Sequence, residues 1–111
     1  MTRFAAPIAE QIWDMKYRFK QADGTPIDKT VEDSWHRIAG ALAAVEKSPE
    51  TWEPKFFDAL SDFKFLPAGR ITAGAGTERS VTLFNCFVMG TIPDSMGGIF
   101  DMLKEAALTM Q

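Results

Sequence analysis

The stretch Val81-Thr-Leu-Phe-Asn-Cys-Phe-Val-Met89 decides the predicted fold, because it is the one run that is typical of a β-strand. It also contains the single cysteine, Cys86. Both sets of alternate positions are largely apolar, which is typical of a strand buried on both sides in a parallel or barrel-interior sheet. One strand cannot form a sheet, and no other stretch pairs with it convincingly. We therefore expect the chain to be part of a longer protein.

A helix is predicted directly after this strand. Thr91-Ile-Pro-Asp94 reads as a turn, and Asp94 or Ser95 is the expected N-cap. Apolar residues then follow at helical spacing as far as Met110. Strand, short loop and helix would open a βαβ unit whose second strand would lie beyond Gln111.

The sequence before the strand divides into two parts. Residues 69–80 contain glycine and threonine without a helical period, and we expect an extended loop that passes close to backbone or ligand. Three amphipathic helices precede it, and their aromatic inner faces predict a small bundle. These helices are expected to begin at Pro7, Thr30 and Pro49 and to end near Phe19, Lys47 and Phe63.

Composition bounds the class of protein. The 111 residues suffice for one domain with a core, and 46% of them are hydrophobic. A net charge of −3 with scattered Lys and Arg gives no electrostatic case for binding nucleic acid or a membrane surface. No apolar run reaches the length of a membrane-spanning helix. A single cysteine fits a reducing compartment, and we expect a cytoplasmic protein.

Two residues are candidates for thiol or metal chemistry. Cys86 is either a small buried core residue, which the pattern favours, or a reactive thiol next to the polar Asn85. His36 is the one histidine, so we expect no metal site and interpret it as a surface or helix-packing residue. No Cys–His pair can be placed from the sequence.

The glycines do not form a nucleotide-binding fingerprint. Gly69, Gly74 and Gly76 precede the predicted strand, whereas phosphate-cradling glycines follow a strand and open a helix. Gly97-Gly98 does open a helix, where its amides could hold an anion. We favour a close-packed helix start at that position.

An ordered series of motifs gives a more specific indication. The motifs are 6-APIAEQIWDMKYR-18, 30-TVEDSW-35, 65-FLPAGRITAGAGT-77, 85-NCFV-88 and 94-DSMGGIFDMLKEAA-107. Together they resemble the large catalytic subunit of ribonucleotide reductase, and they are most similar to its adenosylcobalamin-dependent class. The resemblance covers essentially the whole chain.

The resemblance implies a mostly α-helical fold in two parts. Residues 1–68 would form the helical N-terminal domain of the reductase, with about three helices. Residues 69–111 would form the incomplete start of a ten-stranded α/β barrel. The strand around Cys86 would be the first barrel strand, and the helix after Ser95 would pack outside it.

The resemblance also implies a function and a site. The full enzyme would reduce ribonucleotides, as di- or triphosphates, to 2′-deoxyribonucleotides for DNA synthesis by radical chemistry. Cys86 would be one of two redox-active cysteines beneath the substrate ribose, and Gly69, Asn85 and Cys86 would line the substrate site. Gly69 would offer only backbone contacts, since related enzymes often carry Ser or Thr there. Nucleotide effectors and a thioredoxin-like reductant would be partners.

Several parts required by such an enzyme are missing from these residues. The second thiol, the radical-forming cysteine and the residues that contact adenosylcobalamin would lie downstream, so we expect the chain alone to be inactive. A second hypothesis is a truncated, non-catalytic remnant that forms homo-oligomers through an exposed strand edge and its last helix. A third hypothesis, a thiol-based redox protein, requires a reactive Cys86.

Overall fold

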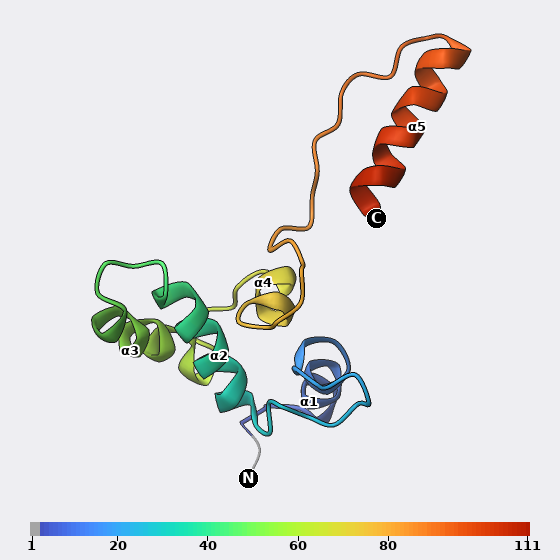
Figure 1. The fold of residues 1–111 in the computed structure, drawn as a ribbon. Helices are drawn as coiled ribbons and strands as arrows, with labels where there is room; N and C mark the ends of the chain where they lie inside the picture. The colour runs from blue at the N-terminus through green and yellow to red at the C-terminus, as the bar shows by residue number, and fades with distance from the viewer. Residues whose placement is uncertain (1–2) are drawn as a thin grey trace.

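The structure is a computed structural model that describes residues 3–111. Residues 3–80 form a group of short helices, which we call the helical body, and a long extended segment leads from it to a separate helix (Figure 1). The elements are α1 (Pro7–Ile12), the π-helix η1 (Trp13–Tyr17), α2 (Val31–Ala43), α3 (Pro49–Leu60), the 3-10 helix η2 (Ser61–Phe63), α4 (Gly69–Gly74) and α5 (Met96–Met110).

The first predicted helix exists but changes type midway. Pro7 starts it at the first helical position, as expected. From Trp13 the turns widen, and the Arg18 amide donates to the Trp13 carbonyl five residues earlier, at 2.9 Å. The Trp13 ring is buried, and its Nε1 donates to Ser34 Oγ on α2 at 3.0 Å. The predicted continuous helix to Phe19 is therefore two shorter elements.

The second predicted helix is confirmed at its start. The Thr30 hydroxyl accepts from the Asp33 amide at 3.4 Å, and the Asp33 carboxylate accepts from the Thr30 amide at 3.1 Å, which completes a capping box. The helix ends at Ala43 rather than near Lys47, and Val45 beyond its end is 87% exposed. Its inner face supplies most of the core of the helical body, whose buried members are Trp13, Val31, Trp35, Ile38, Ala39, Leu60 and Ala75.

The third helix packs against α2, as the bundle prediction requires. Ser48 lies at its N-cap position without a side-chain cap bond, and Pro49 begins the helix. The helix ends at Leu60, and Asp62 and Phe63 then take left-handed backbone angles, with φ of 57° and 59°. After this turn the Phe63 ring packs on the Trp35 ring, with the two ring centroids 5.3 Å apart.

The prediction of an extended loop over residues 69–80 is wrong in its first half. Gly69–Gly74 form the short helix α4, whose Thr72 hydroxyl donates to the Ala68 carbonyl at 3.2 Å. Partners that are distant in sequence complete this helix, and a local pattern cannot reveal them. Gly76, with φ of +74°, lies in the turn that follows this helix.

The predicted strand over residues 81–89 is also not formed. Within residues 3–111 no strand is present, and the one β-type contact is an isolated bridge between Lys20 and Pro26. The expected burial on both faces is wrong too, since Cys86 is exposed and Val88 is fully exposed. The physical reason is that a strand needs a neighbouring strand to bond its amides and carbonyls.

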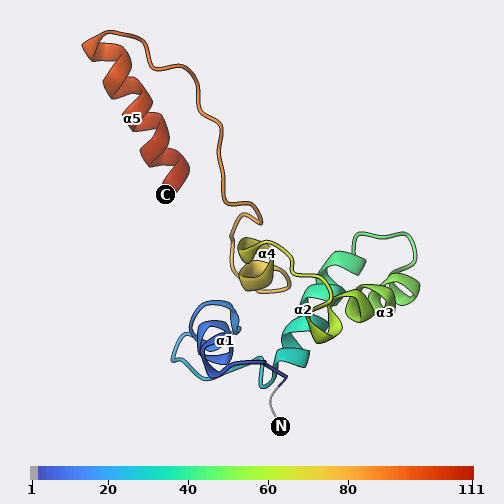
Figure 2. The same ribbon diagram turned by 180° about the vertical axis from the view of Figure 1, so that it is seen from behind.

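The last predicted helix is confirmed and lies apart from the body. Ser95 caps α5 by accepting from the Gly98 amide at 3.0 Å. The Pro93 ring lies against Gly98, which confirms a close-packed helix start. Both views show α5 away from the other helices (Figures 1 and 2). The radius of gyration is accordingly 18.2 Å, whereas a compact domain of this length has about 13 Å.

No helix among the described residues is both long enough and apolar enough to cross a membrane.

Candidate functional site

The three residues expected in a substrate site lie in two places. Gly69 is exposed at the first position of α4, and a Cβ there would lie 3.5 Å from the Tyr17 ring of η1. Asn85 and Cys86 lie in the extended segment, where both are exposed. The structure therefore brings Asn85 and Cys86 together by sequence adjacency alone and does not bring Gly69 to them.

A contact at the C-terminal end of α4 connects this helix to the start of the extended segment. A Cβ built on Gly74 would lie 2.8 Å from Val81 Cγ2 and 3.3 Å from Leu83 Cδ2. The start of the extended segment thus packs closely on α4 before the chain leaves the body. Phe84 and Phe87 flank Asn85 and Cys86 in the sequence. Their rings pack on each other with centroids 5.1 Å apart.

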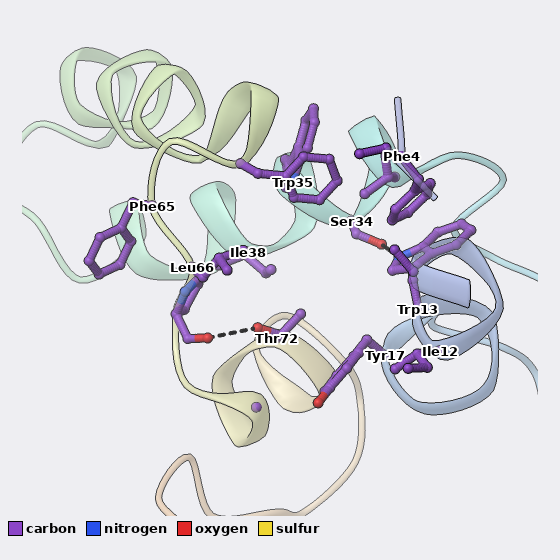
Figure 3. A pocket seen from close by; sticks show the side chains of 16 residues that line it. Phe4, Ile12, Trp13, Tyr17, Ser34, Trp35, Ile38, Phe65, Leu66 and Thr72 are labelled. Atoms are coloured by element: carbon purple, nitrogen blue, oxygen red, sulfur yellow. Dashed lines mark hydrogen bonds between the residues drawn. The ribbon is translucent and has the colours of Figure 1, made fainter. Parts of the chain in front are cut away.

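The helical body contains an apolar hollow of about 550 Å³. Figure 3 shows its side chains converging from α1, η1, α2 and the segment that leads into α4. Its polar atoms are few: Ser34 Oγ is bonded to Trp13, and Thr72 Oγ1 lies 3.4 Å from the Pro67 carbonyl. Such a hollow suits apolar groups rather than phosphates. Its main lining residues are Phe4, Ile12, Trp13, Tyr17, Trp35, Ile38, Phe63, Phe65, Leu66 and Gly69.

The buried ion pair between Arg37 and Asp28, next to the C-terminal end of α4, is a feature that the sequence analysis missed. Arg37 Nη2 lies 3.0 Å from Asp28 Oδ2, and these side chains are only 7% and 4% exposed. Ser34 Oγ donates to the same Asp28 oxygen at 2.6 Å. One signal was available in the sequence. Ser34 and Arg37 are polar residues three positions apart, interleaved with the apolar stripe of α2.

The described residues provide no cluster of three or more His, Cys, Asp or Glu that could hold a metal ion. His36 is exposed, and its ring stacks on Phe57 with centroids 4.0 Å apart. This contact confirms its interpretation as a helix-packing residue on the surface.

Comparison with known proteins agrees with the helical structure of residues 3–80. The family described as "Ribonucleotide reductase, all-alpha domain" matches residues 3–80. Two relatives, both named ribonucleoside-diphosphate reductase subunit alpha, come from Helicobacter pylori strain 26695 and Chlamydia muridarum. They are 34% identical over 93 residues and 28% identical over 90 residues, which is 84% and 81% of this chain.

The chain spans about a tenth of the length of these relatives, since the matches cover 11% and 8% of them. No solved structure matches the chain.

Proposed function

We propose a function that proceeds from one premise: the chain belongs to the ribonucleotide reductase family, through the all-alpha domain at residues 3–80. The chain forms the N-terminal part of a catalytic subunit that reduces ribonucleotides to 2′-deoxyribonucleotides for DNA synthesis. The observation that carries this proposal is the match of 84% of the chain to the Helicobacter subunit. The printed names of the relatives favour ribonucleoside diphosphates as substrates.

The proposed chemistry assigns Cys86 as one thiol of a redox pair. Two thiols lose two electrons and two protons and form one disulfide. The ribose 2′-hydroxyl leaves as water, and C2′ receives a hydrogen in its place. A thioredoxin-like dithiol then reduces the disulfide by exchange. The second thiol must come from residues outside this chain, since Cys86 is its single cysteine.

Two observations support a role for residues 81–89 in a larger sheet. Their backbone forms no ladder within residues 3–111, and the Cys86 side chain is exposed. Unpaired strand-like backbone is suited to pairing with another strand. In such a sheet Asn85 and Cys86 would line the substrate site, and Gly69 would contribute backbone groups from α4.

The resemblance also implies adenosylcobalamin as the cofactor of the whole enzyme. The described residues do not fit this group. Its corrin ring carries amide side chains that need polar partners, whereas the hollow of the helical body is lined almost entirely by apolar groups. We therefore place the cofactor contacts of the whole enzyme outside residues 3–111.

A chimera tests the proposal. This chain replaces the matching residues of the Helicobacter subunit, and deoxyribonucleotide formation is measured with a dithiol as reductant. We expect turnover, and we expect Cys86→Ser to lower it by at least about a hundredfold, because the electron-donating thiol is lost. Val88→Ala is the matched control, since Val88 is fully exposed and lies two positions from Cys86. An inactive chimera, or Cys86→Ser with full turnover, contradicts the proposal.

The chain alone is proposed to be inactive, because one thiol cannot supply two electrons as a disulfide. Incubation of the 111-residue chain with ribonucleotide, adenosylcobalamin and a dithiol should give no deoxyribonucleotide. Product above the enzyme-free background refutes this part of the proposal.

One observation favours the second candidate function, a self-associating helical module. The apolar side chains of α5 are exposed, including Phe100 at 59% and Leu103 at 60%. A helix with an uncovered apolar face tends to associate. Sedimentation velocity across a concentration series should then show an oligomer that Leu103→Asp dissociates, while Glu105→Lys on a polar position leaves it intact. A monomer at all concentrations eliminates this candidate.

A further inference from the structure

We propose that Arg37 is a positioning residue for the substrate site, because its guanidinium fixes α4, the helix that begins at Gly69. The inference rests on the proposed function, which gives Gly69 a backbone contact with substrate. Arg37 is not assigned a contact with substrate. It acts from the C-terminal end of α4, through the position of the helix.

The ion pair with Asp28 fixes the orientation of the guanidinium. Arg37 Nε and Nη2 donate to Asp28 Oδ2 at 3.2 and 3.0 Å. The carboxylate is held in turn by the Ser34 hydroxyl at 2.6 Å and by the Phe19 amide at 3.1 Å. A buried ion pair is tolerated only where its remaining donors and acceptors have partners, so the planar fork has little freedom to turn.

Arg37 Nη1 and Nη2 also bond backbone carbonyls at the ends of two helices. Nη1 donates to the Ala75 carbonyl at 2.6 Å, and Nη2 donates to the Thr72 carbonyl at 2.9 Å. Nη2 also lies 3.2 Å from the carbonyl of Tyr17, the last residue of η1. The last carbonyls of a helix lack partners within it, and a cation there also complements the helix dipole. Arg37 therefore closes the C-terminal ends of both α4 and η1.

The helix α4 depends on such external contacts. It has six residues, no side-chain N-cap bond and no basic residue in its own last turn. Isolated helices of this length are unstable in water. Packing reinforces the hold of Arg37, since Ala75 is 2% exposed and a Cβ on Gly76 would lie 2.8 Å from the Arg37 carbonyl oxygen.

Both parts of the proposed substrate site lead away from this one helix. Gly69 is its first residue, and the extended segment follows its C-terminal end (Figure 1). Val81 at the start of this segment packs on Gly74. A shift of α4 would therefore move Gly69 and the residues around Val81, whereas Cys86 lies five positions farther along the extended segment. Arg37 is the one charged side chain that bonds both the Thr72 and Ala75 carbonyls in the described residues.

Amide hydrogen exchange on the 111-residue chain tests the hold on α4. Arg37→Lys keeps the charge beside Asp28 but cannot span the carbonyls with a planar fork. We expect the amides of Thr72 and Ala75, which donate to Ala68 and Ile71, to exchange at least about tenfold faster. Exchange in α2 and α3 should stay unchanged.

Arg18→Lys is the matched control. Arg18 also bonds Asp28, through the carbonyl at 2.6 Å, and pairs with Asp14, but no bond joins it to α4. Its replacement should leave the exchange of the α4 amides at the wild-type rate. Unchanged exchange of α4 in Arg37→Lys, or equal acceleration across all helices, overturns the inference.

Turnover of the chimera supplies the functional readout. Arg37→Lys should raise KM for the ribonucleotide about tenfold and leave kcat within about twofold, because binding geometry changes while the thiol chemistry does not. An active chimera whose Arg37→Lys variant keeps its KM overturns the inference alone. A chimera that is inactive with Arg37 intact contradicts the proposed function instead, and the exchange experiment still decides whether Arg37 holds α4.

Discussion

At the scale of single residues, Gly76 is the position where a side chain is least tolerated. Its φ is +74°, and a Cβ there would lie 2.7 Å from Arg37 Cγ. We expect Gly76→Ala to lower the free energy of unfolding by about 2 kcal/mol, from strain and forced repacking. Urea denaturation followed by Trp fluorescence measures this change.

Gly40 is the matched control for Gly76. It lies inside α2, and a Cβ there would meet only the tip of the Glu53 side chain at 3.4 Å. Gly40→Ala should raise stability by up to about 1 kcal/mol through helix propensity. Equal effects of the two substitutions would refute the role given to Gly76.

Asp14 gives the chain a small dependence of stability on pH. The hydrogen bond from Arg18 at 2.9 Å, then the one from Lys20, lowers the pKa of this carboxyl from its ordinary 3.8. A lowered folded pKa means that the stabilisation is present above pH 3.8 and is lost as pH falls through the folded value.

The corresponding prediction concerns Asp14→Asn. Because the carboxylate is 43% exposed, we expect the variant to lose under about 1 kcal/mol at pH 7. The difference from the wild type should shrink as the pH falls below 3.8. Urea denaturation at pH 7 and pH 3 measures it, and a difference that grows in acid contradicts the assignment.

At the scale of elements, the capping box of α2 is the clearest local determinant. Thr30→Ala removes the hydroxyl that accepts from the Asp33 amide and should cost about 1 kcal/mol of stability. Thr30→Ser keeps an acceptor and should cost less than half as much. Thermal unfolding by circular dichroism compares the two, and equal losses would mean that the cap contributes nothing.

Elements with local signals were predictable from the sequence, and those with distant partners were not. Pro7, Thr30, Pro49 and Ser95 mark helix starts through bonds or backbone preferences within one turn, and all four starts are confirmed. The helix α4 was missed because the residue that donates to its Thr72 carbonyl, Arg37, lies 35 positions away in the sequence. The strand predicted over residues 81–89 is not formed among the described residues, because none of them pairs with it, and its place in a larger sheet stays a prediction.

The candidate site divides in the same way. Gly69, Asn85 and Cys86 were proposed from motifs, and their roles stay predictions. The apolar hollow and the Asp28–Arg37 pair were not predictable, because burial of a polar residue depends on which helices meet around it. Ser34 and Arg37, polar residues within the apolar stripe of α2, mark a buried polar position in the sequence, but they do not identify Asp28 as the partner.

At the scale of the whole molecule, the extended segment separates the helical body from α5 (Figure 1). Residues 81–88 are exposed and belong to no helix or strand. Limited chymotrypsin digestion should cut first at Phe84 or Phe87, because exposed backbone without protection is cleaved most readily. Mass spectrometry identifies the cuts.

The cleaved helical body should keep its stability. The core lies within residues 13–75, so we expect its free energy of unfolding to change by less than about 0.5 kcal/mol after cleavage. Phe56 and Phe57 in α3 are internal controls that should resist digestion. First cuts within α2 or α3 would show that the body is not the stable unit.

The carbonyl contacts of Arg37 also set an order of events in folding. They join residues 35 and 38 positions apart, whereas the α2–α3 hairpin needs a loop of only a few residues. Short loops close faster and at lower entropic cost than long ones, so capture of α4 should come after the hairpin has formed. A contact made after the transition state changes the rate of unfolding rather than the rate of folding. Arg37→Lys should then speed unfolding in stopped-flow experiments and leave the refolding rate of the hairpin unchanged, which makes release of α4 the first step by which this molecule comes apart.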